Sequence, residues 1–313
     1  MSLWLALVVI AQIINAVVAL VDKYIVSARS TVLKPLPYAF WLSVLSAGSI
    51  VIFLFDWVRI PIEGLAVPSF RAVASPTLLV ASLSIVAGYS YFTALVSLFT
   101  SLKDADASDA VPVVGALTAC FTLLLSFAFL DAKLTYTIFL GFAFLVLGTL
   151  LVSRMRLSWR TLLSVVHAGL MFGVHYVSIK ALFLYAPNFD TAFFWSRLAI
   201  AFVALSFLLI PEYSYKIINH TREATVRTGA LVLGNKFLAG LASILILKAI
   251  EHGDVSLVQA LGGIQYVFLL IVSMVMGTFT ARNIGEAVAP RDVLQKTISV
   301  PLIAIGFFLL FSH

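Results

Sequence analysis

The chain is built from long apolar runs that alternate with short polar connectors. A helix that crosses the hydrocarbon core of a bilayer needs about 20 mostly apolar residues, with a range of about 17–25. The runs are continuous and lack the alternation of apolar and polar positions found in membrane β-barrels, so they favour helices. The pattern predicts an all-α integral membrane protein with ten transmembrane helices, at residues 3–21, 38–55, 77–99, 110–130, 134–153, 161–179, 191–210, 229–247, 255–278 and 295–311.

The connectors indicate a single membrane domain covering residues 1–313. None is long enough to form a soluble domain, the longest being 56–76, 211–228 and 279–294. The basic segment "RMRLSWR" (154–160) separates the fifth and sixth predicted helices. The chain therefore divides into two five-helix halves, 1–153 and 154–313.

Weak similarities link the two halves in the same order. Because five is an odd number, the second half must enter the membrane in the opposite direction to the first, so we expect inverted-topology repeats. The aligned pairs are "NAVVALVDK" (15–23) with "FGVHYVSIK" (172–180), "AFWLSV" (39–44) with "FFWSRL" (193–198), and "DASDAVPVVG" (106–115) with "DVSLVQALGG" (254–263).

A charged segment at 248–254 is expected to form the turn between the third and fourth helices of the second half. Asp254 occupies a position where a helix N-cap is needed, and a short polar acceptor there satisfies free backbone N–H groups. Its predicted counterpart in the first half is the segment 100–110.

The amino-acid composition supports a membrane protein and restricts the kinds of partner that we expect. The chain is 62% hydrophobic and 11% charged, against about 45–50% and about 25% in soluble domains. The net charge is +6, but Lys and Arg lie between apolar runs and form no patch with interleaved aromatics. The charge fits contact with anionic lipid rather than nucleic acid. We expect a multi-pass protein of the plasma or inner membrane, in contact with the lipid bilayer, with no nucleic-acid partner.

Motifs for catalysis and metal binding are missing from the sequence. Cys120 is the single cysteine, so neither an internal disulfide nor a Cys/His zinc site is predicted. The chain contains no HExxH, P-loop or GxSxG motif. We therefore expect no enzyme activity, no metal and no cofactor.

Several stretches resemble one transporter family. "VDKYIVSA" (21–28), "LKAIEHGDVSLVQALGGIQYVF" (247–268) and "DVLQKTISVPLIAIGFFLLF" (292–311) are similar to the EamA-like branch of the drug/metabolite transporter superfamily. The resemblance covers nearly the whole chain. It implies ten helices in two inverted halves and a central cavity lined by the first, third and fourth helices of each half.

One departure concerns the related small multidrug-resistance proteins, which carry a glutamate inside the first helix for proton and cation exchange. The first predicted helix here contains no acid, and Asp22 lies at its end. This argues against proton-coupled export of drug cations by that mechanism.

The orientation in the membrane stays open. Thirteen Lys and Arg residues lie in odd-numbered connectors, when Lys296 at the start of the tenth predicted helix is counted with the connector before it, and five lie in even-numbered ones. The positive-inside rule then places both termini outside, whereas the resemblance implies cytoplasmic termini.

Two cations lie inside predicted helices, where charge costs about 2.5–3.5 kcal/mol at the helix centre. Lys236, beside Asn235, either binds a carboxylate or phosphate in a cavity or extends its ammonium to the interface. Arg197 has the same alternatives, or forms a structural pair with Asp190 two turns earlier.

Uncharged polar residues complete the candidate solute-binding set. Gln259 and Gln265 accompany small residues in "QALGG", and Tyr266 follows them. Gln12 and Asn15 share a face of the first helix. These amides either contact a solute or bond neighbouring helices.

His175 lies two turns from His167 in the sixth segment. It is a candidate for the cavity, but packing or a satisfied hydrogen bond is favoured. The nearby "GLMFG" (169–173) has the small-xxx-small spacing typical of closely packed helices.

These observations favour a secondary transporter that moves a small polar metabolite, an amino acid or organic anion, by alternating access. Its partner is then a small-molecule solute, and a homodimer is compatible with the sequence. Two alternatives stay open: a multidrug or lipophilic-compound exporter of the same fold, and a non-transporting membrane protein.

Overall fold

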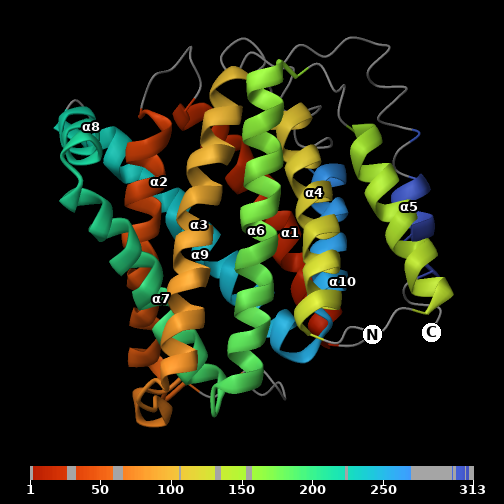
Figure 1. The fold of residues 1–313 in the computed structure, drawn as a ribbon, viewed down its shortest axis with the longest axis horizontal. Coiled ribbons are helices and arrows are strands. Elements are labelled where there is room, and N and C mark those ends of the chain that lie inside the picture. Colours follow the sequence, from red (N-terminus) through yellow and green to blue (C-terminus); the bar gives the residue numbers. More distant parts are fainter. Residues whose placement is uncertain are drawn as a thin grey trace.

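The computed structural model describes residues 3–26, 33–58, 66–105, 107–130, 135–152, 157–222, 225–268, 298, 301–306 and 308–309. All regular structure in these residues is helical (Figure 1). The helices are α1 (Leu3–Val26), α2 (Pro35–Val44), α3 (Leu78–Asp104), α4 (Ala107–Phe129), α5 (Tyr136–Val152), α6 (Trp159–Tyr185), α7 (Phe189–Ser206), α8 (Pro211–Arg222), α9 (Val226–His252) and α10 (Val255–Ala260). Three 3₁₀ helices join them, at η1 (Leu45–Phe55), η2 (Phe70–Ala72) and η3 (Phe207–Leu209).

Seven of the described helical stretches are long and apolar enough to cross a membrane. They comprise α1, α2 with η1, α3, α4, α6, α7 with η3, and α9, each at a predicted segment. The prediction of an all-α, multi-pass membrane protein is confirmed. Of the other three predicted segments, 134–153 contains the shorter apolar helix α5, and 255–278 is described as helix from Val255 to Phe268. The segment 295–311 is described in part, as helix at 298, 301–306 and 308–309.

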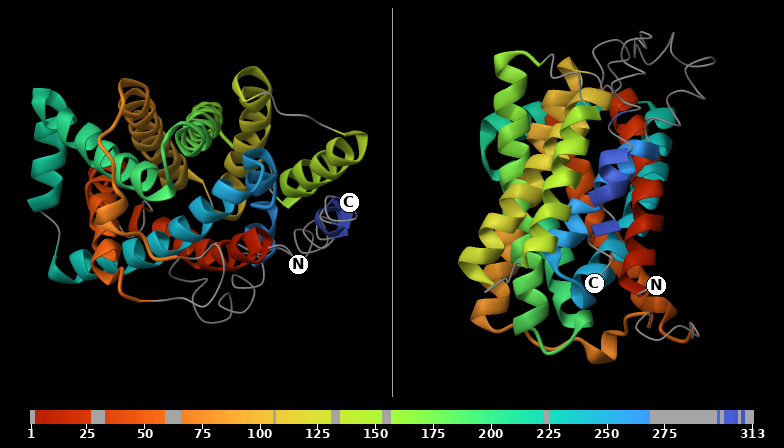
Figure 2. Two further views of the ribbon diagram at one scale, coloured as in Figure 1. Left: turned by 90° about the horizontal axis from the view of Figure 1, so that it is seen from below. Right: turned by 90° about the vertical axis from the view of Figure 1, so that its right-hand side faces the viewer.

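The helices form two layers around a central interior (Figure 2). α3 packs along α6 and α6 along α4 in one layer, while α1 packs along α9 in the other. α7 and α2 close one side of the bundle, where α7 contacts both α3 and α2. This arrangement places the inner faces of α1 and α9 opposite those of α3 and α6.

α8 is a helix that the apolar runs did not predict, because its sequence "PEYSYKIINHTR" mixes polar and apolar positions. Ile217 is buried, and Trp41 Nε1 of α2 donates to Thr221 Oγ1 at 2.9 Å. On its exposed side Lys216 Nζ donates to Glu212 Oε1 at 2.5 Å, which lowers the pKa of Glu212 and raises the pKa of Lys216. Residues 211–222 of the connector thus form an amphipathic helix docked against α2.

Two lysines bind the ends of helices in the same way. Lys23 of α1 is buried and its Nζ donates to Leu102 O at 2.7 Å and Ala105 O at 2.6 Å, at the end of α3. Lys180 of α6 donates to the carbonyls of Ile250 at 2.8 Å and Gly253 at 2.9 Å, at the end of α9. A cation is favourable at a helix C-terminus, where carbonyl groups lack intrahelical partners.

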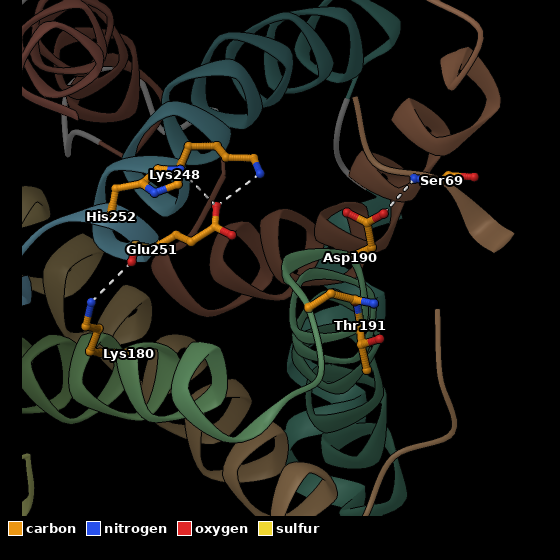
Figure 3. A network of polar contacts seen from close by, with 8 residues as sticks. Ser69, Lys180, Asp190, Thr191, Lys248, Glu251 and His252 are labelled. Carbon is orange, nitrogen blue, oxygen red and sulfur yellow. Dashed lines mark hydrogen bonds and ion pairs between the residues drawn. The ribbon is translucent and has the colours of Figure 1, made fainter. Parts of the chain in front are cut away.

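The charged segment 248–254 was predicted to be a turn, but residues 248–252 form the end of α9 and only Gly253 and Asp254 connect it to α10. Figure 3 shows the contacts around this segment. Glu251 Oε2 lies 3.0 Å from Lys248 Nζ and 3.5 Å from His252 Nε2. Lys248 Nζ also lies 3.5 Å from the centroid of the Phe189 ring. Asp254 is the N-cap of α10, as predicted, and its Oδ1 accepts from the N–H of Ser256 at 2.8 Å.

The two glycines of "GLMFG" allow α6 to approach α4 closely. A Cβ atom on Gly169 would lie 2.6 Å from Leu117 Cβ, and one on Gly173 would lie 2.8 Å from Phe121 Cβ. Real Cβ atoms do not pack at such distances, so the spacing of small residues indicates helix contact here, as the sequence suggested.

Gly169→Ala is expected to lower the unfolding temperature of the detergent-purified protein, since overpacking costs about 1–3 kcal/mol. Gly240→Ala in α9 is the matched control, because its Cβ would have no neighbour within 4 Å and alanine favours a helix by about 1 kcal/mol. Equal unfolding temperatures for the two variants would contradict the close packing of α4 and α6.

Candidate functional site

A cavity of about 220 Å³ lies between the two layers of helices. All eight side chains predicted as candidates line it: Gln12, Asn15, His175, Asn235, Lys236, Gln259, Gln265 and Tyr266. They come from α1, α6, α9 and the helical segment 255–268, which are distant in the chain. The fold therefore gathers them in one place, while their role in binding a solute stays a prediction.

Amide side chains form the part of the lining near α1. Asn15 Nδ2 donates to Gln12 Oε1 at 3.3 Å, so the two residues share a face of α1 as predicted. Gln265 Nε2 donates to the backbone oxygen of Asn15 at 3.2 Å and ties the segment after α10 to α1. Gln259 Nε2 is buried and has no partner in the described part of the chain. Thus one of these amides bonds a neighbouring helix, two bond each other within α1, and the Gln259 donor has no partner among the described residues.

A three-residue network joins α1, α2 and α9 at the cavity. Asp22 Oδ1 accepts from Tyr38 Oη at 2.5 Å and from Asn235 Nδ2 at 2.7 Å. Asn235 Nδ2 also lies 3.1 Å from Tyr38 Oη. The three side chains are almost fully buried, with exposed fractions of 8%, 0% and 3% for Asp22, Tyr38 and Asn235. Both donors point to one carboxylate oxygen, and Asn235 Oδ1 has no partner among the described residues.

Asp22 corrects one expectation from the sequence. α1 continues to Val26, beyond the predicted end at residue 21, so Asp22 lies inside the helix. It is buried and lines the cavity. The boundary was misplaced because "VDKYIV" contains two charged residues, which end an apolar run in the sequence. The buried bonds to Tyr38 and Asn235 explain how a helix accommodates them.

Lys236 and Arg197 bring two cations to the same cavity. Lys236 shares the cavity lining with Asp22 and Arg197. This location agrees with the cavity interpretation of Lys236 rather than extension to the interface.

Arg197 of α7 is 4% exposed and lies with Cζ 5.5 Å from the centroid of the Phe193 ring. Its Nη1 donates to Ser243 Oγ at 3.4 Å, and its buried Nε has no partner among the described residues. The alternative of a pair with Asp190 is wrong, because Asp190 Oδ2 accepts from the backbone N–H of Ser69 at 3.0 Å (Figure 3). The guanidinium therefore has donors available.

Aromatic rings from α3 and α6 form a contiguous wall of the cavity, which we call the aromatic wall: Tyr91, Phe172, His175 and Tyr176. Ring centroids are 5.0 Å apart for Tyr91 and His175, and 6.3 Å apart both for Tyr91 and Phe172 and for Phe172 and Tyr176. His175 Nδ1 lies 2.8 Å from the backbone oxygen of Ala87. A carbonyl can only accept, so Nδ1 carries the hydrogen.

The satisfied hydrogen bond predicted for His175 is thus present. His167 contacts a different residue, with Nδ1 2.7 Å from Ser97 Oγ. The described residues contain no group of three His, Cys, Asp or Glu side chains that could hold a metal ion.

Sequence reasoning missed Asp22, Tyr91, Tyr176 and Ser243 as cavity residues. Asp22 could have been found by extending the first helix over "VDK", since a buried acid is costly and therefore informative. The tyrosines and the serine gave no such signal, because isolated residues of these types also pack between helices or lie near the interface.

No family model and no curated protein sequence matches the chain. Similarity appears among solved structures, where 16 chains match. One crystal structure covers 96% of this chain and 96% of its own chain, with a TM-score of 0.59 and 14% sequence identity. At that identity the likeness concerns the fold alone.

Asp22→Ala is expected to lower the unfolding temperature in detergent, because Tyr38 Oη and Asn235 Nδ2 would lose their common acceptor. Each unsatisfied buried donor costs about 1–3 kcal/mol. Asp22→Asn keeps an oxygen acceptor and should lower the temperature less. Asp104→Ala, at the exposed end of α3, is the control. An Asp22→Ala protein as stable as the control would contradict a structural role for the network.

Proposed function

We propose that the protein is a secondary transporter that moves a small polar metabolite across the plasma or inner membrane by alternating access. The observation that carries the proposal is the cavity, which lies inside a helical membrane bundle and is lined by amides and two cations. Polar and ionisable groups are costly within a membrane and mark solute pathways. The solute crosses chemically unchanged, so the protein is not an enzyme.

Alternating access in this proposal depends on two inverted five-helix repeats, and two features support them. α3 packs on α6, while α1 packs on α9. If α1 in the first half corresponds to α6 in the second, and α3 corresponds to α9, then the packed pair α3–α6 is equivalent to the packed pair α9–α1. The lysines agree, because Lys23 of α1 binds the end of α3 and Lys180 of α6 binds the end of α9. Together with the ten helices predicted from the sequence, these pairings fit the EamA-like branch of the drug/metabolite transporter superfamily, to which we assign the chain.

An amino acid or organic anion is the favoured solute, because the cavity holds two cations and one acid, and the acid already accepts two hydrogen bonds. One observation favours the exporter of lipophilic compounds as a second candidate. Asp22 lies inside α1 and lines the cavity, so an acid is present where the sequence indicated none. A non-transporting role has no such support, since it does not require a polar cavity.

Purified protein in liposomes is expected to exchange a radiolabelled solute from a panel of amino acids and organic acids. Lys236→Met should reduce uptake about 10-fold or more, because a charge-assisted hydrogen bond contributes about 1.5–3 kcal/mol. Lys216→Met, on the exposed face of α8, is the matched control and should transport normally. Equal uptake by Lys236→Met and the control would contradict a role for Lys236 in binding the solute. Exchange of lipophilic cations alone would favour the second candidate, the exporter of lipophilic compounds.

A further inference from the structure

We propose that the cavity recognises an aromatic carboxylate with a single net negative charge, whose carboxylate lies between Lys236 and Arg197 and whose ring lies on the aromatic wall. The inference rests on the proposed function for its biological meaning, but it concerns binding alone. It narrows the proposed solutes from amino acids and organic anions in general to aromatic monocarboxylates.

The formal charges of the residues that line the cavity sum to +1. Lys236 and Arg197 each count as a cation and Asp22 counts as an anion in their ordinary ionisation states, and these three are the Asp, Glu, Lys and Arg residues of the described lining. An uncompensated charge is costly in a membrane interior. A monoanion would neutralise the site, whereas a zwitterion would leave the excess and a cation would increase it.

Unsatisfied donors indicate where the carboxylate binds. Arg197 Nε and Gln259 Nε2 are buried without partners in the described part of the chain. The guanidinium has five N–H groups, and its bond to Ser243 spans 3.4 Å. Arginine binds a carboxylate through two parallel hydrogen bonds, so a bound carboxylate would satisfy donors that the protein leaves free. Asp22 is less available to an ammonium group, since Tyr38 and Asn235 already donate to it.

The aromatic wall faces the same cavity as this cation. Arg197, Tyr91 and Tyr176 all belong to the cavity lining. Offset and edge-to-face contacts between rings are favourable at centroid distances of about 4.5–7 Å, so the wall can continue its own packing onto a flat ligand. The cavity volume of about 220 Å³ is below the roughly 300–1,000 Å³ of pockets for drug-sized ligands. A carboxylate attached directly to one ring fits this size, and it would present its charge and its ring to groups that line the same cavity.

Isothermal titration of the full chain in detergent tests the proposal with probes that differ in one property each. Benzoate is expected to bind at least about 10-fold more tightly than each of three probes. Benzamide lacks the charge, cyclohexanecarboxylate lacks the flat ring, and acetate lacks the ring altogether. Phenylalanine and benzylamine supply the zwitterion and the cation. Tightest binding by either of these, equal binding of benzoate and acetate, or no binding of benzoate would overturn the inference.

Variants locate the two parts of the site. Arg197→Lys keeps the charge but loses the planar fork, and it should weaken benzoate about 10-fold while leaving benzamide unchanged. Phe172→Leu should weaken benzoate and leave acetate unchanged, with Phe202→Leu as the control because Phe202 is 67% exposed. Unchanged benzoate affinity in both Arg197→Lys and Phe172→Leu would place the ligand elsewhere and reject the proposal.

The two proposals fail separately. Binding of benzoate with no exchange of any solute in liposomes would refute transport and leave the recognition intact. Exchange of an aliphatic solute by a protein that does not bind benzoate would refute the recognition and leave transport intact.

Discussion

Hydrocarbon supplies no hydrogen-bond partners, and every polar group inside the bilayer must therefore find its partner within the protein. Helices meet this requirement along their length, but the carbonyls of their last turns remain free. Lys23 and Lys180 bind such carbonyls at the ends of α3 and α9. The same requirement explains the thorough bonding of Asp22, whose carboxylate would otherwise be an isolated charge within α1.

Against this background, the groups that stay unsatisfied are informative. Six buried side-chain atoms have no partner among the described residues, and three of them, Arg197 Nε, Asn235 Oδ1 and Gln259 Nε2, belong to residues that line the cavity. The other three are the hydroxyls of Ser43, Thr122 and Ser126, which lie outside the lining. Burying a polar group without a partner is costly, so the amide and guanidinium groups at the cavity fit a site completed by a ligand. Lys23 and Lys180, which lie outside the cavity lining, are bonded to backbone carbonyls and therefore have a structural role.

Close helix packing sets the shape of this cavity. Gly169 and Gly173 let α6 approach α4, and α6 carries His175 and Tyr176 to the aromatic wall. On the opposite side, the Asp22–Tyr38–Asn235 network ties α1 and α2 to α9. Because Asn235 and Lys236 are neighbours in the chain, this network also holds the backbone that presents the Lys236 ammonium. The position of Lys236 therefore depends on a hydrogen-bond network, whereas the position of the aromatic wall depends on close helix packing at two glycines.

The sequence by itself determined the fold class and most of the spanning helices, because the cost of moving polar groups into hydrocarbon requires long apolar runs, and these are visible residue by residue. It also identified Lys236, Asn235 and the amides, since polar residues within apolar runs are conspicuous. Only the tertiary structure decided that Asp22 lies inside α1, that Arg197 faces the cavity rather than Asp190, and that Tyr91 and Tyr176 line it. These outcomes depend on which helix faces meet across large separations in the chain, and a local pattern of hydrophobicity contains no information about the partner on the other side.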